Sequence, residues 1–194
     1  MPNEGPNEGQ SLLRRVVAGI ASGGAVSEDG ANAKSILNQA AESFARKPSE
    51  AESTIPTGFD PRAASLFEAV IEAAFLVANA DGVFDDTERQ TFEQVVAEAC
   101  QNTVQPDDVS DLVSDLLDQL KEDGVAQRIQ MISRVVGEHE HKLEVLRIAA
   151  LMAYVSGGVD DSEREVMDSL AQSFELDASV VDSAIAQAQA ALGG

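Results

Sequence analysis

The side chains of this chain best suited to binding a cation lie in and just before one short stretch, ADGVFDDTER at residues 80–89. Gly82 falls where a calcium-binding EF-hand loop makes its sharp turn, if the loop is counted from Val77. At the first loop position, however, Val77 stands where an Asp should supply an oxygen. The pattern therefore predicts a weak divalent-cation site for calcium, magnesium or zinc. Its candidate ligands are Asn79, Asp81, Asp85 and Glu88.

A second stretch, VSGGVDDSER at residues 155–164, repeats the first one. Asp160 and Glu163 are the cation ligands that it offers. Ser156 replaces Asp81 of the first stretch, so the second copy lacks one more oxygen ligand. A second ion site is therefore a poorer candidate than the first.

The same carboxylates also have a purely architectural interpretation. Asp85, followed three residues later by Glu88, matches a capping box. In such a box the Asp accepts from free N–H groups at the start of a helix, and the Glu reaches back to the capping residue. Asp160 and Glu163 repeat this pattern. The sequence alone leaves both interpretations open.

No other constellation predicts catalysis. His139 and His141 lie among glutamates in GEHEHKLE, which is typical of an acid-rich helix start, and zinc requires about four ligands. Cys100 lies among apolar residues with no neighbouring His. The chain also lacks the Ser-centred and Lys-bearing glycine motifs of hydrolases and nucleotide-binding proteins. We therefore expect that the chain is not an enzyme. The alternative is a metal-dependent hydrolase that uses the carboxylates of Asp81, Asp85 and Glu88.

The two stretches lie between segments with helical periodicity. From Arg62 onward, apolar residues recur at intervals of three and four, and turn residues interrupt them. No convincing strand is found, so the predicted fold class is all-α. The seven predicted helices span residues 61–80, 86–101, 106–124, 125–136, 138–155, 161–174 and 178–192.

The predicted helices form an internal repeat. Aligning the two motifs places Val95 on Leu170, and the helix that follows each motif then matches as well. Residues 62–122 and 138–192 are therefore predicted to be two related three-helix units. Each unit is too small to bury its apolar face alone, so we expect one domain over residues 59–194 with the fourth helix linking the units.

Residues 1–58 are predicted to form a flexible leader. The repeated PNEG at the start cannot bury enough surface to offset the entropy of ordering. Two short amphipathic helices, at about residues 11–21 and 34–46, follow it. Neither is long enough to be stable alone, so each must pack on the bundle, on the other, or on another protein.

The charge of the chain restricts its partners. Thirty-four acidic residues against thirteen basic ones leave a net charge of -21, which repels nucleic acids and anionic membranes. Arg14 and Arg15 give the first leader helix a mildly basic face. A scaffold attached peripherally to a membrane through the leader is therefore an alternative function. The single cysteine and the absence of a signal peptide or an apolar span favour a cytoplasmic protein.

One predicted helix, residues 106–124, carries a row of acidic side chains spaced by three or four residues. Like charges at this spacing destabilise a helix, so a protein partner with a basic or apolar surface is one explanation for them. A merely solvated face is the other. We call this row the acidic ridge. It consists of Asp108, Asp111, Asp115, Asp118 and Glu122.

The helix ending ANADGVFDDTER, repeated as AYVSGGVDDSER in an acidic, helical chain, resembles the TerB-like (tellurite-resistance protein B) family over residues 62–190. The resemblance implies an all-helical bacterial protein linked to tellurite and general stress resistance, which acts through partner binding or metal sensing. It implies no established catalytic activity. Family acidic residues would correspond to Asp81, Asp85 and Glu88. We therefore expect a non-enzymatic acidic interaction module, with the loop 79–88 as a candidate site for weak binding of a divalent cation.

Overall fold

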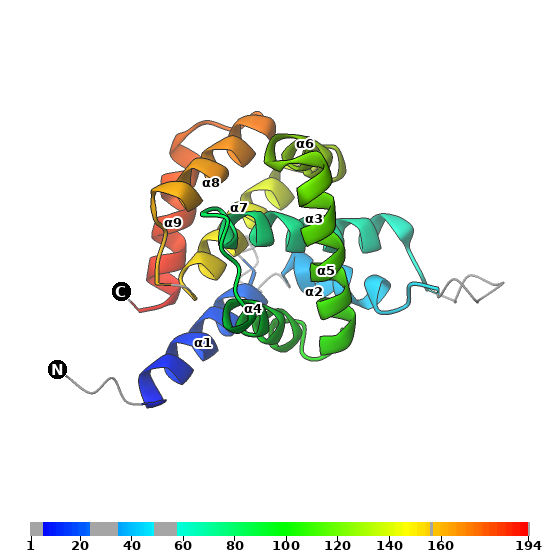
Figure 1. Cartoon of the computed structure of the whole chain (residues 1–194), viewed down its shortest axis with the longest axis horizontal. Coiled ribbons are helices and arrows are strands. Elements are labelled where there is room, and N and C mark those ends of the chain that lie inside the picture. Colours follow the sequence, from blue (N-terminus) through cyan, green and yellow to red (C-terminus); the bar gives the residue numbers. More distant parts are fainter. Residues whose placement is uncertain (1–5, 24–34, 49–57, 156, 194) are drawn as a thin grey trace, which may run out of the picture.

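The computed structural model describes residues 6–23, 35–48, 58–155 and 157–193, and within them the secondary structure is helical with no strand (Figure 1). The predicted all-α class is therefore confirmed for the described part of the chain. None of the helices described is both long enough and apolar enough to cross a membrane. The helices are α1 Pro6–Ala21, α2 Ile36–Phe44, α3 Pro61–Ala78, α4 Asp86–Ala99, α5 Pro106–Asp123, α6 Val125–Val135, α7 His139–Ala153, α8 Asp161–Ser173 and α9 Ser179–Ala191.

Local sequence explains where these helices start and stop. The Asp60 side chain accepts from the Arg62 N–H ahead of α3, and Pro61 opens that helix with a backbone angle suited to its first turn. Pro106 opens α5 in the same way. Gly124, with a φ of 76°, ends α5 and leads directly into α6. Helices α3 to α9 correspond to the seven predicted helices, with ends that differ by one or two residues.

Helices α3 and α7 form the centre of the molecule and pack against each other, with the remaining helices around them (Figure 1). Every residue of 69–77 in α3 and of 145–153 in α7 is buried. A helix that is apolar on all sides must be covered on all sides. These two helices therefore build the core to which the other helices attach.

Both helices of the predicted leader belong to this core. Val16 and Ile20 of α1 and Leu37 of α2 are at most 1% exposed, and Phe44 of α2 stacks on Phe67 of α3 with 4.5 Å between ring centroids. Of the three alternatives for these segments, the structure therefore shows packing on the bundle. Helix α1 also begins at Pro6, earlier than predicted. The predicted flexibility of residues 1–5, 24–34 and 49–57 concerns segments outside the described residues, and the domain boundary near residue 58 stays a prediction.

Two charged side chains are buried in the central helices. Glu72 of α3 pairs with Arg128 of α6, and desolvation by burial raises the pKa of Glu72. Arg147 of α7 donates from Nη1 to the Gly19 carbonyl at 2.7 Å, which ties α7 to α1. Its Nε and Nη2 have no hydrogen-bond partner, and burial lowers the pKa of Arg147. Polar contacts thus add specificity to the packing of α1 and α6.

Candidate functional site

The loop between α3 and α4 holds the first set of predicted ligands and forms a complete capping box. Asp85 Oδ1 accepts from the N–H groups of Thr87 and Glu88, at 2.8 and 2.9 Å. Glu88 Oε2 accepts in return from the Asp85 N–H at 3.0 Å. Asp81 Oδ1 accepts from the Val83 N–H at 2.8 Å. Three of the four predicted ligands therefore stabilise the local backbone, and the fourth, Asn79, is the C-cap residue of α3.

The loop between α7 and α8 repeats this geometry. Asp160 Oδ1 accepts from the Glu163 N–H at 2.8 Å, and Glu163 Oε2 accepts from the Asp160 N–H at 2.9 Å. The hydrogen bond from the Glu163 backbone, followed by that from the Ser162 hydroxyl, lowers the pKa of Asp160. The predicted capping boxes are thus confirmed at both loops.

The metal hypothesis gains no support from this geometry. In the part of the chain that the structure describes, no group of three or more His, Cys, Asp or Glu side chains is placed to hold a metal ion. His141 Nε2 lies 3.5 Å from Glu138 Oε2, which is a local contact within one helix turn. Ion binding at residues 79–88 and at Asp160 and Glu163 therefore stays a prediction.

Arg89, the last residue of the first motif, joins α4 to α5. Its Nε lies 2.7 Å from Glu93 Oε1. Its Nη2 donates to the Ser110 carbonyl at 2.9 Å and to the Ser114 hydroxyl at 2.7 Å. Arg89 therefore fixes the position of α5 relative to the loop and to α4.

Arg164, the last residue of the second motif, makes the corresponding contacts between α8 and α9. Its Nη2 lies 2.6 Å from Asp182 Oδ1, and its Nε lies 3.8 Å from Asp168 Oδ2. Sequence reasoning assigned no role to either arginine. The sequence did contain a signal for these contacts. Both motifs end in an arginine that is followed four positions later by an acidic residue, Glu93 in the first copy and Asp168 in the second.

The acidic ridge lies on the exposed side of α5, opposite Val109, Val113 and Leu116, which are buried. All five of its carboxylates are exposed. One of them, Asp118, pairs with Lys121 of the same helix at 2.9 Å. The structure therefore places these side chains on one exposed face of α5, and their binding to a partner stays a prediction.

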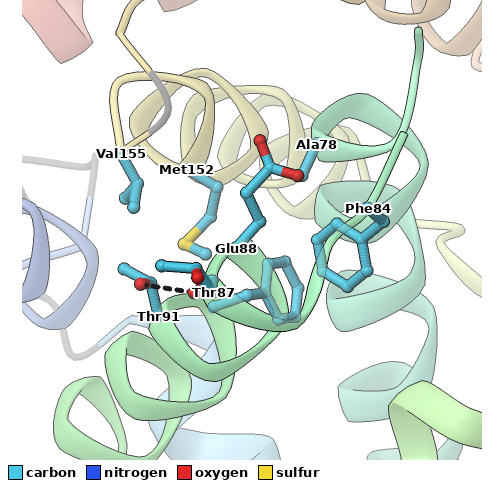
Figure 2. A pocket seen from close by; sticks show the side chains of 8 residues that line it. Ala78, Phe84, Thr87, Glu88, Thr91, Met152 and Val155 are labelled. Carbon is cyan, nitrogen blue, oxygen red and sulfur yellow. Dashed lines mark hydrogen bonds between the residues drawn. The ribbon is translucent and has the colours of Figure 1, made fainter. Parts of the chain in front are cut away.

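A pocket of about 160 Å³ opens beside the first loop, between the start of α4 and the end of α7 (Figure 2). We call it the loop pocket. Figure 2 shows Met152 and Val155 of the α7 side facing the threonines of α4, with Phe84 on the opposite side. Most of the lining is apolar. It consists of Ala78, Phe84, Thr87, Glu88, Thr91, Phe92, Met152 and Val155.

The walls of the loop pocket combine fixed and adaptable side chains. Phe84 makes edge-to-face contacts with Phe75 and Phe92, with 5.4 and 5.9 Å between ring centroids. The Thr91 hydroxyl donates to the Thr87 carbonyl at 2.8 Å. Met152, which is unbranched, can adjust its shape to an occupant. The arrangement suits binding of a small apolar group, and no catalytic constellation accompanies it.

A protein-family comparison relates this architecture to known proteins. The family described as Tellurite resistance protein TerB matches residues 67–190, which include α4 to α8, both capping boxes and the acidic ridge. No curated protein and no solved structure matches the chain. Because the match spans more than half of the chain and the structure is helical as the resemblance implied, the chain belongs to the TerB family.

Proposed function

We propose that this chain is a non-enzymatic interaction module of the tellurite and stress resistance type, and that the acidic ridge of α5 binds a cationic surface of a protein partner in the cytoplasm. Family membership supports the resistance class. The observation that carries the proposal is the row of five exposed carboxylates on α5 with one lysine among them.

The electrostatics of α5 support a partner rather than a role in folding. Like charges three and four residues apart each destabilise an isolated helix by a few tenths of a kcal/mol. In the described structure only Asp118 of the ridge has an ion-pair partner, Lys121. A basic surface would relieve this repulsion, and long-range attraction would accelerate its association.

The ridge stands on a rigid base. Val113 and Leu116 fix the inner face of α5 in the core, and Arg89 connects the helix to α4 through Ser110 and Ser114. Its carboxylates therefore keep their spacing without a bound partner. Such preorganisation reduces the entropy lost on binding.

We further propose that the domain consists of two related three-helix units joined by α6. The paired capping boxes and the matched contacts of Arg89 and Arg164 support this arrangement. If the units share one interior, residues 59–124 produced alone should lack helical circular dichroism and cooperative melting. A cooperatively folded fragment would contradict the arrangement.

The experiment for the function compares two variants that remove equal charge from different surfaces. The ridge variant changes all five ridge carboxylates to Asn or Gln, and the control variant changes five exposed glutamates elsewhere to Gln. Full-length proteins are used to capture and cross-link partners at low and high salt, and to restore growth on tellurite in a host that lacks the gene. The control positions are Glu42, Glu98, Glu140, Glu165 and Glu175.

We expect the wild type and the control variant to retain the same partner and to support the same growth. The ridge variant should lose both, although its melting temperature should not fall. A partner retained equally by the ridge variant, or capture that is insensitive to salt, would contradict the proposal.

A further inference from the structure

We propose that the loop pocket receives one leucine- or phenylalanine-sized side chain of a partner segment that also carries lysine or arginine next to it. The inference rests on the proposed function, because the occupant belongs to the cationic partner. The loop pocket would give this partner a second contact, away from the acidic ridge. This contact would recognise an apolar side chain next to a basic one.

The size of the loop pocket sets the size of its occupant. Its volume is about 160 Å³. An apolar cavity of about 150 Å³ in another protein is large enough to bind benzene. A phenylalanine ring or a leucine side chain therefore fits, whereas an extended lipid chain or a nucleotide does not.

The lining favours an apolar group that inserts into a preformed site. Phe84 is fixed by its contacts with Phe75 and Phe92, so one wall is rigid. On the other wall, Met152 can adapt to a branched or an aromatic side chain. Val83 precedes Phe84 and is 58% exposed, which extends the apolar surface to the solvent. Exposed apolar surface beside a concave site is typical of interaction sites.

The charges around the loop pocket decide which apolar segment is accepted. Glu88 lines the pocket, and Asp81, Asp85 and Asp86 lie exposed on the adjoining loop. The one basic residue within residues 80–100 is Arg89, and Glu93, Ser110 and Ser114 already bind its guanidinium. In the part of the chain that the structure describes, none of these four carboxylates has an ion-pair partner, so the loop attracts an approaching cation and repels an anionic ligand.

The second loop differs in the residue that corresponds to Glu88. Glu163 is 7% exposed, whereas Glu88 is only half-buried and forms part of the pocket lining. A partly exposed glutamate in the pocket lining is thus found at the first loop, whereas the corresponding glutamate of the second loop is buried. The capping box keeps Glu88 in place, because its Oε2 accepts from the Asp85 N–H.

The probes for this proposal are three synthetic peptides, Lys-Lys-Leu-Lys-Lys, Lys-Lys-Phe-Lys-Lys and Lys-Lys-Ala-Lys-Lys, with blocked ends. Each is titrated into the full-length protein carrying ¹³C-labelled methionine methyl groups. The Met152 methyl signal, assigned with Met152→Leu, reports on the pocket, and Met131 and Met167 serve as internal references. We expect the Leu and Phe peptides to shift the Met152 signal and to bind at least about fivefold more tightly than the Ala peptide, because buried apolar area increases affinity.

Two pairs of variants separate shape from charge. Thr91→Leu places additional side-chain volume on the lining and should abolish the preference for Leu and Phe, whereas Thr103→Leu, on an exposed turn, should not. Glu88→Gln keeps a capping-box residue but removes the charge. It should reduce affinity two- to fivefold and weaken the salt dependence. Glu98→Gln, on the exposed face of α4, is its control.

A Met152 signal that no peptide shifts at millimolar concentration would overturn the proposal, and so would equal binding of the Ala and Leu peptides. The fold of each variant is verified by its melting temperature. One outcome would support the ridge and overturn the pocket proposal. In it, the peptides bind the wild type without shifting its Met152 signal, and they no longer bind the ridge variant. If Met152 responds equally in the ridge variant, the pocket proposal stands without the ridge.

Discussion

Glu72 of α3 and Arg128 of α6 form an ion pair inside the protein, with 2.5 Å between Glu72 Oε1 and Arg128 Nε. Their side chains are 8% and 11% exposed. Asp123, at the end of α5, adds a second contact to the same guanidinium at 3.1 Å. The pair joins the central helix to the segment that follows the acidic ridge.

Removing one partner of this pair should destabilise the protein more than removing both. Glu72→Leu leaves the Arg128 guanidinium buried with only the partly exposed Asp123 nearby, which should lower the free energy of unfolding by about 3–5 kcal/mol. Glu72→Leu with Arg128→Met removes both buried charges and should recover most of this loss. Urea unfolding of the two variants and the wild type measures the difference. Equal losses in both variants would contradict a paired interior charge.

The same pair predicts a specific pH dependence. Desolvation raises the pKa of Glu72 above its ordinary value of 4.5 in the folded protein. The folded state therefore holds this proton more tightly than the unfolded chain, and the resulting stability is present below pH 4.5 and lost as the pH rises through the raised pKa. Relative to the double variant, the wild type should lose free energy of unfolding as the pH rises from 4.5. A difference that stays constant or grows with pH would contradict this sign.

Local chemistry was sufficient to predict the helices of the family-matched region and both capping boxes. The apolar residues of α3 recur at helical spacing, and Asp85 and Glu88 lie three positions apart. Both signals involve contacts between residues near in sequence. The motif residues that were predicted to form capping boxes therefore form them in the structure.

Contacts between distant residues could not be predicted in the same way. The amphipathic pattern of α1 indicated an apolar face but did not identify its partner, and the structure places Ile20 in the common core. The interhelical contacts of Arg89 depend on where α5 packs. The loop pocket likewise depends on the approach of Met152 to Phe84, from opposite halves of the domain.

Glu175, which follows α8, has a backbone conformation that a glycine should stabilise. Glu175 is exposed and has a φ of 58°, a region that side chains with a Cβ rarely adopt. Glu175→Gly should raise the free energy of unfolding by about 0.5–1 kcal/mol, because glycine adopts this angle without strain. Glu165→Gly, at an exposed position inside α8, should lower it by about the same amount. Chemical denaturation compares them, and the same sign for both would contradict the expectation.

Arg89 should be important for stability because its guanidinium joins two helices. Arg89→Met removes the contacts to Glu93, Ser110 and Ser114, and should lower the free energy of unfolding by about 1–3 kcal/mol. Arg62→Met, at an exposed position early in α3, should change it by less than about 0.5 kcal/mol. Thermal unfolding followed by circular dichroism measures both. Equal stability of the two variants would remove the assigned role of Arg89.

The first helix should behave as part of the core rather than as a detachable arm. Ile20 is 1% exposed, so Ile20→Ala should lower the free energy of unfolding by about 2–5 kcal/mol through lost burial and a residual cavity. Leu12→Ala, at a partly buried position on the same helix, should cost less. Removal of residues 1–22 should lower the melting temperature, because it uncovers the apolar surfaces of α4, α7 and α9 that α1 contacts. An unchanged melting temperature after this removal would instead show that α1 is a docking arm.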